Sequence, residues 1–522
     1  MTDTGSRRRA GVLVPLFSIP SSHSWGVGEI ADLPLLADWM REAGLSTLQL
    51  LPVNEMADGQ TSPYSAMSAM AIDPIFIALR DVHEVVEAGG DSALDDEDSE
   101  RLELARRAPT VDYKTVRDLK NRALRAAFES FRAGEWRGGG PRATAMRTYI
   151  DAQRWWLDDY ALFRALHAEN DGRYWTEWDA PIRSREPQAI AATRLRLEDD
   201  ILYYSFLQWI AGEQWARARE ACDGIEILGD FPFMVSGDSA DVWSRQQEFR
   251  LDASVGVPPD AFSATGQDWG LPVYLWDVHE AGDYQWLRAR ARRCTDLFHG
   301  FRVDHLVGFF RTFVREQDGS TYFVPADESS QQQQGERILC LLQDSGAELI
   351  AEDLGVVPQF VRESLARLAV PGLKVIRWER DWKAEGKPFR DPAAYPAVSV
   401  AISGTHDTET VAEWWTNADG EERSSAVQLP SLVAANIAVD ETFTDRLRDA
   451  VLQCLCGAGS DLVLVPMQDV FGWYERINVP AVVSDENWSW RLPWPVDDLL
   501  RQEDAVERAE FLQRVGRQTR RV

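Results

Sequence analysis

Short apolar runs recur along the chain and alternate with segments whose apolar residues follow a helical spacing. The runs that predict strands lie at 46–53, 73–79, 225–233, 301–305, 348–355, 372–378, 398–407 and 461–469. Alternation of strand and helix favours a parallel sheet. Eight such units predict an α/β fold of the (β/α)8 TIM-barrel type, and a doubly wound open sheet is the structural alternative.

One long part of the chain breaks this alternation. Between about 112 and 222 helical spacing dominates, most clearly at 149–170 and 197–222. We therefore expect the barrel to begin in 1–79, a mainly helical insertion to occupy 80–222, and the rest of the barrel to follow in 223–522. Two polar stretches predict irregular structure: the acidic, Gly-rich 89–100 as a turn or linker, and the Gln-rich 328–336 as a solvated loop.

Acidic residues gather at the ends of the predicted strands. The residues that end an apolar run in this way are Asp230, Asp304, Glu352, Asp353, Asp407 and, beside Gln468, Asp469. A single Asp after a strand is often a helix N-cap, and this explanation stays open for Asp230 and Asp469. The repeated pattern instead indicates the C-terminal rim of a barrel, where such enzymes build their active sites. Asp304, Glu352 and Asp407 would then converge from the fourth, fifth and seventh strands.

Converging carboxylates indicate glycoside chemistry. Retaining cleavage needs one ionised carboxylate as nucleophile and one protonated carboxyl as acid, about 5–5.5 Å apart. Arg302 precedes Asp304 by two residues, so both project to the same side of a strand, and the cation would keep Asp304 ionised. Neighbouring negative charges would raise the pKa of Glu352. The sequence shows no Ser-His-Asp arrangement, Gly-rich phosphate loop, HExxH or CxxC motif.

Composition narrows the class of partner. The formal net charge of −29 argues against binding nucleic acid or an anionic membrane, since phosphate binding needs a basic face. No apolar run is long enough for a membrane span. The chain has 21 Trp against 12 Tyr, and flat indole faces of this kind suit stacking on sugar rings as well as core packing.

Cysteine usage and the N-terminus favour a cytoplasmic protein. The five cysteines are odd in number, scattered, and lack metal-ligand spacing, which is typical of reduced, buried thiols. Three arginines precede an apolar stretch at the N-terminus, but Pro15 and Pro20 interrupt it and no small-residue cleavage site follows. We therefore do not expect a secretory signal.

An ordered set of motifs runs almost from end to end of the chain. It comprises SIPSSHSWGVGEI, LQLLPV, SPYSAMSAMAIDP, WLDDYALFRAL, GDFPFMVSGDSADVW, GVPPDAFSATGQDWGLPVYLW, FRVDHLVGFF, LIAEDLGVVPQFV, PGLKVIRW, GTHDTET and, near the C-terminus, NVP followed by ENWSWRL. With these motifs the sequence resembles the amylomaltases, which are disproportionating 4-alpha-glucanotransferases. The resemblance implies transfer of 1,4-α-glucan segments by retaining double displacement, without a metal or organic cofactor. It also implies a barrel without a C-terminal β-sandwich.

The resemblance assigns roles to particular residues. It implies Asp304 as nucleophile, Glu352 as general acid and base, and Asp407 as the third carboxylate, which grips ring hydroxyls. The implied substrate contacts, which would bind a malto-oligosaccharide or a starch- or glycogen-type glucan, are Arg302, His305, His406, Tyr64, Ser62, Trp269, Gln267 and Asn478. For Tyr64 and Trp269 the alternative is a packing role alone. For His305 and His406 the alternative is a place on the barrel rim where other protein groups satisfy their hydrogen bonds. Trp488 and Trp490 are left unassigned.

Some positions depart from the family pattern. Only the four residues DASV separate Leu251 from Gly256, and the two residues after Asp407 are Thr408 and Glu409. In addition, no Gly-Thr pair follows Asn478, and residues 52–60 lack a Gly/Pro-rich turn. These departures leave the preferred glucan length and the ratio of transfer to hydrolysis open. Two other functions therefore stay in view: an α-glucan hydrolase that uses the same carboxylates, and a glucan-binding barrel without catalysis.

Overall fold

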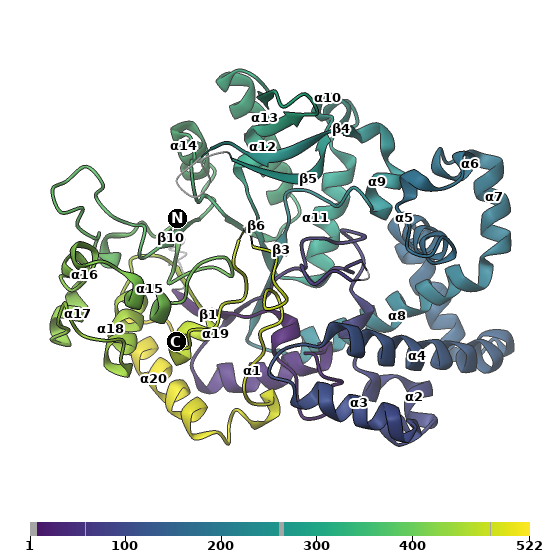
Figure 1. The fold of residues 1–522 in the computed structure, drawn as a ribbon, viewed down its shortest axis with the longest axis horizontal. Helices are drawn as coiled ribbons and strands as arrows, with labels where there is room; N and C mark the ends of the chain where they lie inside the picture. The colour runs from purple at the N-terminus through teal and green to yellow at the C-terminus, as the bar shows by residue number, and fades with distance from the viewer. Residues whose placement is uncertain (1–7, 58, 260–265, 481) are drawn as a thin grey trace, which may run out of the picture.

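Eight parallel strands close into a barrel in the computed structural model, which describes residues 8–57, 59–259, 266–480 and 482–522 (Figure 1). The barrel strands are β1 (Arg9–Leu13), β2 (Thr47–Gln49), β3 (Glu226–Phe231), β6 (Gly300–Val303), β9 (Glu348–Ala351), β10 (Gly372–Val375), β11 (Ser399–Ile402) and β12 (Leu462–Pro466). Closure comes from β1, which pairs with β2 on one side and with β12 on the other. The predicted barrel is confirmed.

One predicted strand is wrong. Residues 74–76 form a 3-10 turn instead, because the Asp73 side chain accepts a hydrogen bond from Ile75 N at 2.9 Å and Pro74 has no amide hydrogen to give to a ladder. The place in the barrel is taken by β1, which we had not recognised in the N-terminal apolar stretch. The strand count is unchanged, so β6, β9 and β11 are the fourth, fifth and seventh strands as expected.

The barrel interior is layered. At its N-terminal end, Arg9 forms ion pairs with Glu226 and Glu348. Above this layer, inward-facing aliphatic side chains form a buried cluster of Leu228, Ile350, Leu373, Val375, Val400, Ile402, Leu462 and Leu464. The alternate residues of the strands pack outward against the helices, as Phe301 and Val463 do. Both faces of each strand are therefore covered, which explains why the strands read as continuous apolar runs.

The segment after the first two strands is helical. It contains α2 (His83–Glu87), α3 (Asp96–Arg107), α4 (Tyr113–Phe131), α5 (Pro141–Glu169), α6 (Ala180–Arg183), α7 (Pro187–Arg196) and α8 (Glu198–Ala221). These helices lie on one side of the barrel, at the right of Figure 1. The linker predicted at 89–100 is wrong in its second half, because Asp95 caps α3 by accepting from Asp98 N at 2.8 Å. The domain boundaries at 79 and 222 stay a prediction.

A second, antiparallel sheet lies at the top of Figure 1 and was not anticipated. Its order is β5 (Gln267–Tyr274), β4 (Phe249–Val257), β7 (Thr312–Glu316) and β8 (Thr321–Val324). The short DASV stretch lies within β4. Residues 260–265, in the middle of one family motif, lie outside the described residues, as do the first seven residues of the chain.

The loop predicted at 328–336 is also wrong, because this stretch begins helix α13 (Glu328–Gln343). Asp327 caps the helix by accepting from Ser330 N at 3.0 Å, and Gln332 donates to Glu336 at 2.9 Å along the helix surface. The apolar residues that bury this helix, Ile338, Leu339, Leu341 and Leu342, come only after the Gln-rich stretch. A composition-based prediction therefore missed its start.

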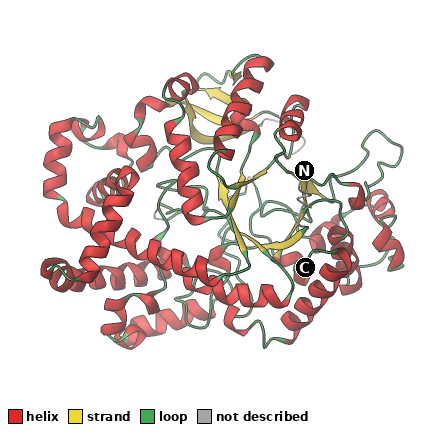
Figure 2. Ribbon diagram, turned by 180° about the vertical axis from the view of Figure 1, so that it is seen from behind, coloured by secondary structure: helices red, strands yellow, loops and turns green. Residues whose placement is uncertain are grey.

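The remaining helices lie around the barrel and the second sheet (Figure 2). They are α1 (Leu33–Glu42), α9 (Ala240–Ser244), α10 (Trp276–Ala281), α11 (Gln285–Leu297), α12 (Val307–Phe310), α14 (Gln359–Arg367), α15 (Val411–Asn417), α16 (Gly420–Ala426), α17 (Pro430–Ala434), α18 (Asp445–Cys456), α19 (Met467–Phe471) and α20 (Glu503–Thr519). After Leu492 the described chain contains a 3-10 turn and α20, and no β-sandwich. Among the described helices, none has the length and apolarity needed to cross a bilayer.

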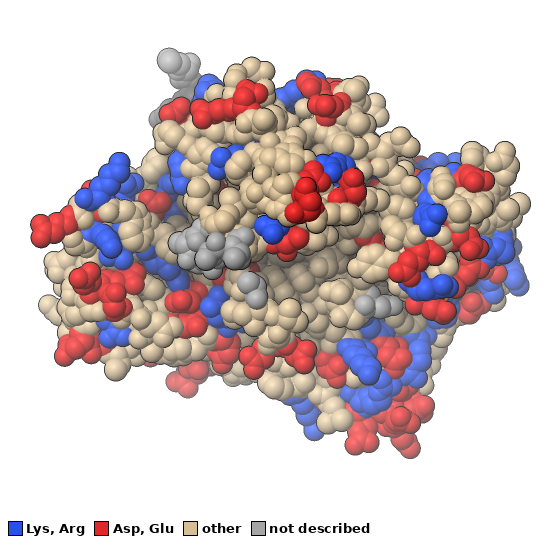
Figure 3. Space-filling view, turned by 45° about the horizontal axis from the view of Figure 1, so that its top comes forward, with Lys and Arg blue, Asp and Glu red and all other residues tan. Residues whose placement is uncertain are grey.

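Acidic and basic side chains are intermingled on the face shown in Figure 3, with no large basic area. A hollow lined mainly by uncharged residues crosses the middle of this view.

Candidate active site

The predicted carboxylates meet around one buried arginine at the C-terminal ends of the barrel strands. Arg302, the third residue of β6, lies 2.6 Å from Asp230 through its Nη1. Its Nη2 lies 2.7 Å from an oxygen of Asp304 and 3.7 Å from an oxygen of Glu352. Because one guanidinium nitrogen is shared, these oxygens of Asp304 and Glu352 lie no more than 6.4 Å apart, the sum of 2.7 and 3.7 Å. The separation of about 5–5.5 Å that a retaining pair needs falls within this limit.

Glu352 is held in a protonated form. Burial is the largest effect on this carboxyl and raises its pKa to about 8, and the negative charge of Asp304 acts in the same direction. Arg302 and the His305 amide, which donates to Glu352 Oε2 at 2.6 Å, oppose the shift. Burial therefore raises the pKa of Glu352 more than the neighbouring carboxylates do, contrary to the expectation from the sequence. His305 has a φ of +43°, in the left-handed region that a non-glycine residue rarely adopts.

Asp407 is held in the opposite state. Burial favours its neutral form, but the adjacent His406 and the hydrogen bonds it receives bring its pKa well below the usual range. His406 Nε2 lies 3.3 Å from one carboxylate oxygen, and Asn478 Nδ2 donates to the other at 2.6 Å. Arg476 donates to the Asp407 carbonyl at 2.9 Å. Asn478, expected as a sugar contact, thus has a hydrogen-bonding role toward Asp407 in this structure.

An aromatic group joins the two halves of the site. The rings of Tyr64 and His406 stack with their centroids 5.3 Å apart, and the Tyr64 hydroxyl donates to Asp230 at 2.7 Å. Trp269, on β5, meets the His305 ring edge-to-face at 4.8 Å. Gln267 accepts from Trp269 Nε1 at 3.2 Å, and the Ser62 hydroxyl accepts from Tyr64 N at 3.4 Å. The predicted site residues therefore form one contiguous group.

The 4-alpha-glucanotransferase family model matches residues 14–497 of the chain. The chain belongs to this family. Its sequence is 30% identical over 515 residues to a 4-alpha-glucanotransferase of Chlamydia pneumoniae, which covers 95% of this chain and 93% of that one. It is 32% identical over 505 residues to a 4-alpha-glucanotransferase of Thermus thermophilus, with 93% and 95% covered. Its fold matches that of the amylomaltase from Streptococcus agalactiae in complex with acarbose, with a TM-score of 0.83 at 26% identity, covering 99% of this chain and 100% of that one.

Other strand-end carboxylates of this 4-alpha-glucanotransferase family member are turned away from Arg302. Asp353 accepts from Leu373 N at 2.8 Å and pairs with Arg362. Asp469 accepts from Ser403 at 2.5 Å and from Val411 N, the first residue of α15, at 2.7 Å. Asp469 therefore binds the first amide of α15, whose N-cap is Thr410, and it does not cap a helix of its own.

Two residues without a role predicted from the sequence lie within this group. Asp230, left open as a possible cap, binds Arg302 and Tyr64 and is almost fully buried. Trp488, left unassigned, packs against Tyr64 and His406. The signal for Asp230 was its place at the end of an apolar run. For Trp488 the sequence offered only its place in a family motif, because its contacts are far away along the chain.

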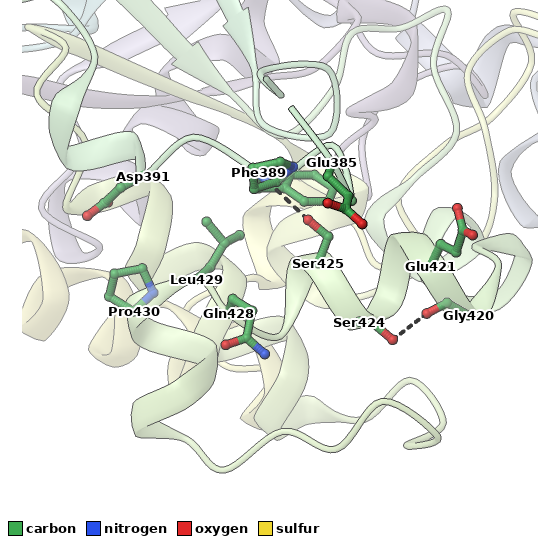
Figure 4. Close-up of a pocket in the computed structure, with 12 residues that line it drawn as sticks. Glu385, Phe389, Asp391, Gly420, Glu421, Ser424, Ser425, Gln428, Leu429 and Pro430 are labelled. Carbon is green, nitrogen blue, oxygen red and sulfur yellow. Dashed lines mark hydrogen bonds between the residues drawn. The ribbon is translucent and has the colours of Figure 1, made fainter. Parts of the chain in front are cut away.

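A hollow of about 840 Å³ lies elsewhere, between the loop at 385–391 and helices α16 and α17 (Figure 4). Its lining includes the Phe389 ring and three carboxylates, Glu385, Asp391 and Glu421. None of the predicted glucan contacts lines it. Within the part of the chain that the structure describes, no group of three or more His, Cys, Asp or Glu side chains is arranged to hold a metal ion.

Proposed function

We propose that the protein cleaves an α-1,4 bond of a donor glucan and transfers the glucosyl segment to the 4-hydroxyl of an acceptor glucan or glucose, with retention. The observation that carries this proposal is the shared Arg302 nitrogen, which brings Asp304 and Glu352 together while Glu352 keeps its proton. Membership of the 4-alpha-glucanotransferase family supports the same reaction.

In the first half-reaction Asp304 attacks the anomeric carbon of the glucose unit at the cleavage point. The bond to the glycosidic oxygen breaks as Glu352 gives that oxygen its proton, which yields a β-glucosyl-enzyme and a shortened glucan. In the second half-reaction the ionised Glu352 takes the proton of the acceptor 4-hydroxyl. The resulting oxygen attacks the anomeric carbon and releases Asp304, so that Glu352 is protonated again.

The surrounding residues would serve this sequence in different ways. Arg302, 2.7 Å from Asp304, would orient the attacking carboxylate. Asp407, whose pKa is low, would accept hydrogen bonds from ring hydroxyls and favour the distorted sugar. Further contacts to the glucan would come from His305, His406, Tyr64 and Trp269, with polar contacts from Ser62, Gln267 and Asn478.

Transfer requires that a glucan hydroxyl, and not water, meets the glucosyl-enzyme. We place acceptor-binding walls on the helical segment 80–222 and on the rim loops. The natural substrates would be malto-oligosaccharides or starch- or glycogen-type glucans. A cytoplasmic location is supported by the five free thiols, of which only Cys340 is exposed.

Incubation with maltotriose tests the proposed function against hydrolysis. Transfer yields glucose together with a ladder of longer maltodextrins, while the number of reducing ends stays constant. Hydrolysis with the same carboxylates increases the number of reducing ends. If neither products nor new reducing ends appear, the protein is a glucan-binding barrel and the proposed activity is wrong.

Replacing the nucleophile gives the first prediction for a variant. We expect Asp304→Asn to lower turnover of maltotriose by at least about a thousandfold while glucan binding, measured by calorimetry with a long malto-oligosaccharide, is largely kept. The matched control is Asp353→Asn, which alters a carboxylate of the same rim that faces away from Arg302. The assignment of Asp304 is wrong if its variant still forms the product ladder at the wild-type rate.

A further inference from the structure

Trp488 has an unusual backbone conformation beside the site. Its φ of +63° lies in the left-handed region, where a bulky side chain is a genuine outlier and points to a functional constraint. The indole is 9% exposed, and its ring centroid lies 5.6 Å from His406 and 5.7 Å from Tyr64. Because Tyr64 and His406 also stack on each other, the three rings form a mutually supporting group.

The backbone of Trp488 is fixed from two directions. Its amide donates to the carbonyl of Ile477 at 2.7 Å, which joins it to the segment whose next residue, Asn478, binds Asp407. Its carbonyl accepts from the hydroxyl of Tyr113 at 2.8 Å. Tyr113 is the first residue of α4 and lies outside the group of predicted site residues.

The attachment to the helical segment continues past Trp488. Val111 N donates to Ser489 O at 2.8 Å, and Thr110 forms an isolated antiparallel bridge with Trp490. The start of α4 is itself fixed, because Asp112 accepts from Thr115 N at 3.0 Å. Residues 110–113 therefore pair with residues 488–490 in a short ribbon. One residue of this ribbon, Trp488, supplies a ring of the three-ring group.

We propose that Tyr113 and Trp488 are positioning residues for the transfer reaction. Tyr113 fixes the backbone of Trp488, and the Trp488 indole holds Tyr64 and His406 in place against the reacting sugar. Tyr64 in turn donates a hydrogen bond to Asp230, which pairs with Arg302, and His406 contacts Asp407. A change in the position of the indole would therefore be passed on to these three residues. The helical segment thus sets the geometry of the catalytic group in addition to lining the substrate path. The inference rests on the proposed function.

Trp488→Gly is the most direct test, because glycine adopts a positive φ without strain and keeps the amide and carbonyl that hold the segment. Only the side chain, which carries the indole ring, is lost. We expect kcat for maltotriose disproportionation to fall about tenfold or more, with a smaller change in KM, because misplaced groups act mainly on the transition state. A kcat equal to that of the wild type would overturn the proposal.

Tyr113→Phe tests the second link and removes a single hydroxyl. The ring keeps its edge-to-face contact with Phe17, whose centroid lies 6.1 Å away. We expect a smaller fall in kcat in the same direction, with KM for maltotriose changed less than kcat. A lower melting temperature with a kcat equal to that of the wild type, measured below that temperature, would reduce Tyr113 to a structural role.

Trp490→Phe is the matched control, since Trp490 lies in the same segment and is equally buried. Its ring packs on Trp473 at 5.9 Å, away from the three-ring group. We expect its kcat to match that of the wild type, and a loss of kcat equal to that of Trp488→Gly would overturn the proposal, because any loosening of this segment would then lower activity. Failure of the proposed function is distinguishable, because the wild type itself would then give no product ladder from maltotriose.

Discussion

Arg302 is the central cation of the site. It is almost fully buried and faces three carboxylates, Asp230, Asp304 and Glu352, with its own pKa held well above the ordinary value. Burial is the largest effect on Glu352 and favours its neutral form. Glu352 lies farther from the guanidinium than Asp230 and Asp304 do, and it keeps its proton although Arg302 opposes this. Burial and distance from the cation thereby separate the role of Glu352 from that of the neighbouring Asp304.

The pH dependence follows from this separation. We expect kcat/KM for maltotriose to decline as the pH rises through about 8, where Glu352 loses the proton that the leaving oxygen needs. Glu352→Gln should lower transfer strongly, and its residual activity should lack the basic limb. A basic limb that is unchanged in a variant with residual activity would contradict the assignment of Glu352.

The raised pKa of Glu352 also makes the stability of the folded protein depend on pH. Its pKa rises from 4.5 to about 8 on folding, so the native state binds the proton more tightly than the unfolded state. The wild type is therefore destabilised progressively as the pH rises from 4.5 to about 8. We expect the melting temperature of Glu352→Gln to exceed that of the wild type by a margin that grows over this window. Thermal unfolding at a series of pH values measures the margin, and a constant margin would contradict the shift.

At the scale of elements, helix α4 is attached to the barrel through a buried ion pair. Lys120 lies 2.6 Å from Glu29, and both side chains are 1% exposed. The ammonium also donates to the carbonyls of Ile75 and Ile77 at 2.7 and 2.8 Å. These bonds satisfy the backbone of the stretch that was wrongly predicted as a strand. Lys120 of helix α4 thus supplies hydrogen bonds that a neighbouring strand would otherwise make.

Lys120→Met is expected to lower the free energy of unfolding by about 3–5 kcal/mol, because Glu29 and two carbonyls lose their partner inside the protein. Adding Glu29→Gln should restore part of this loss by removing the buried charge. Urea unfolding of the single and double variants measures the difference. Lys114→Met, on an exposed position of the same helix, is the control and should unfold like the wild type.

The elements also show what sequence reasoning can reach. Runs buried on both faces, such as 461–469, reveal barrel strands because nearly every side chain is apolar, and the acidic ends of these runs located the rim. The run at 73–79 is equally apolar, but its carbonyls are satisfied by Lys120, which lies more than forty residues later in the sequence. The roles of Asn478 and Trp488 depend on contacts of the same long-range kind. The periodicity of apolar residues indicates which positions are buried, but it does not identify the distant residue that each position contacts.

At the scale of the whole molecule, Arg521 fastens the end of the described chain to the N-terminal end of the barrel. Its guanidinium donates to the carbonyls of Cys456, Ala458 and Ser460 at 2.7, 2.7 and 2.8 Å. It also donates to the carbonyl of Arg9, at the start of β1, at 3.0 Å. The side chain is nearly fully buried, so these carbonyls have no solvent to replace it.

We expect Arg521→Ala to cost about 2–4 kcal/mol in the free energy of unfolding, since several buried carbonyls lose their donor. The kcat of the folded enzyme should be unchanged, because the contacts lie at the end of the barrel opposite the active site. Denaturant unfolding and maltotriose turnover, measured on the same preparation, separate the two effects. Arg517→Ala, at an exposed position of α20, serves as the comparison and should match the wild type in both.

The pairing of β1 with β12 has a consequence for how the protein is made. As the chain leaves the ribosome, β1 emerges long before the neighbour that completes its hydrogen bonds, Leu462–Pro466, which is synthesised about 450 residues later. Until β12 has been synthesised, β1 therefore has an unpaired edge, which invites pairing with other nascent chains. Folding yield in the cell should accordingly depend on how well β1 is shielded until β12 has emerged.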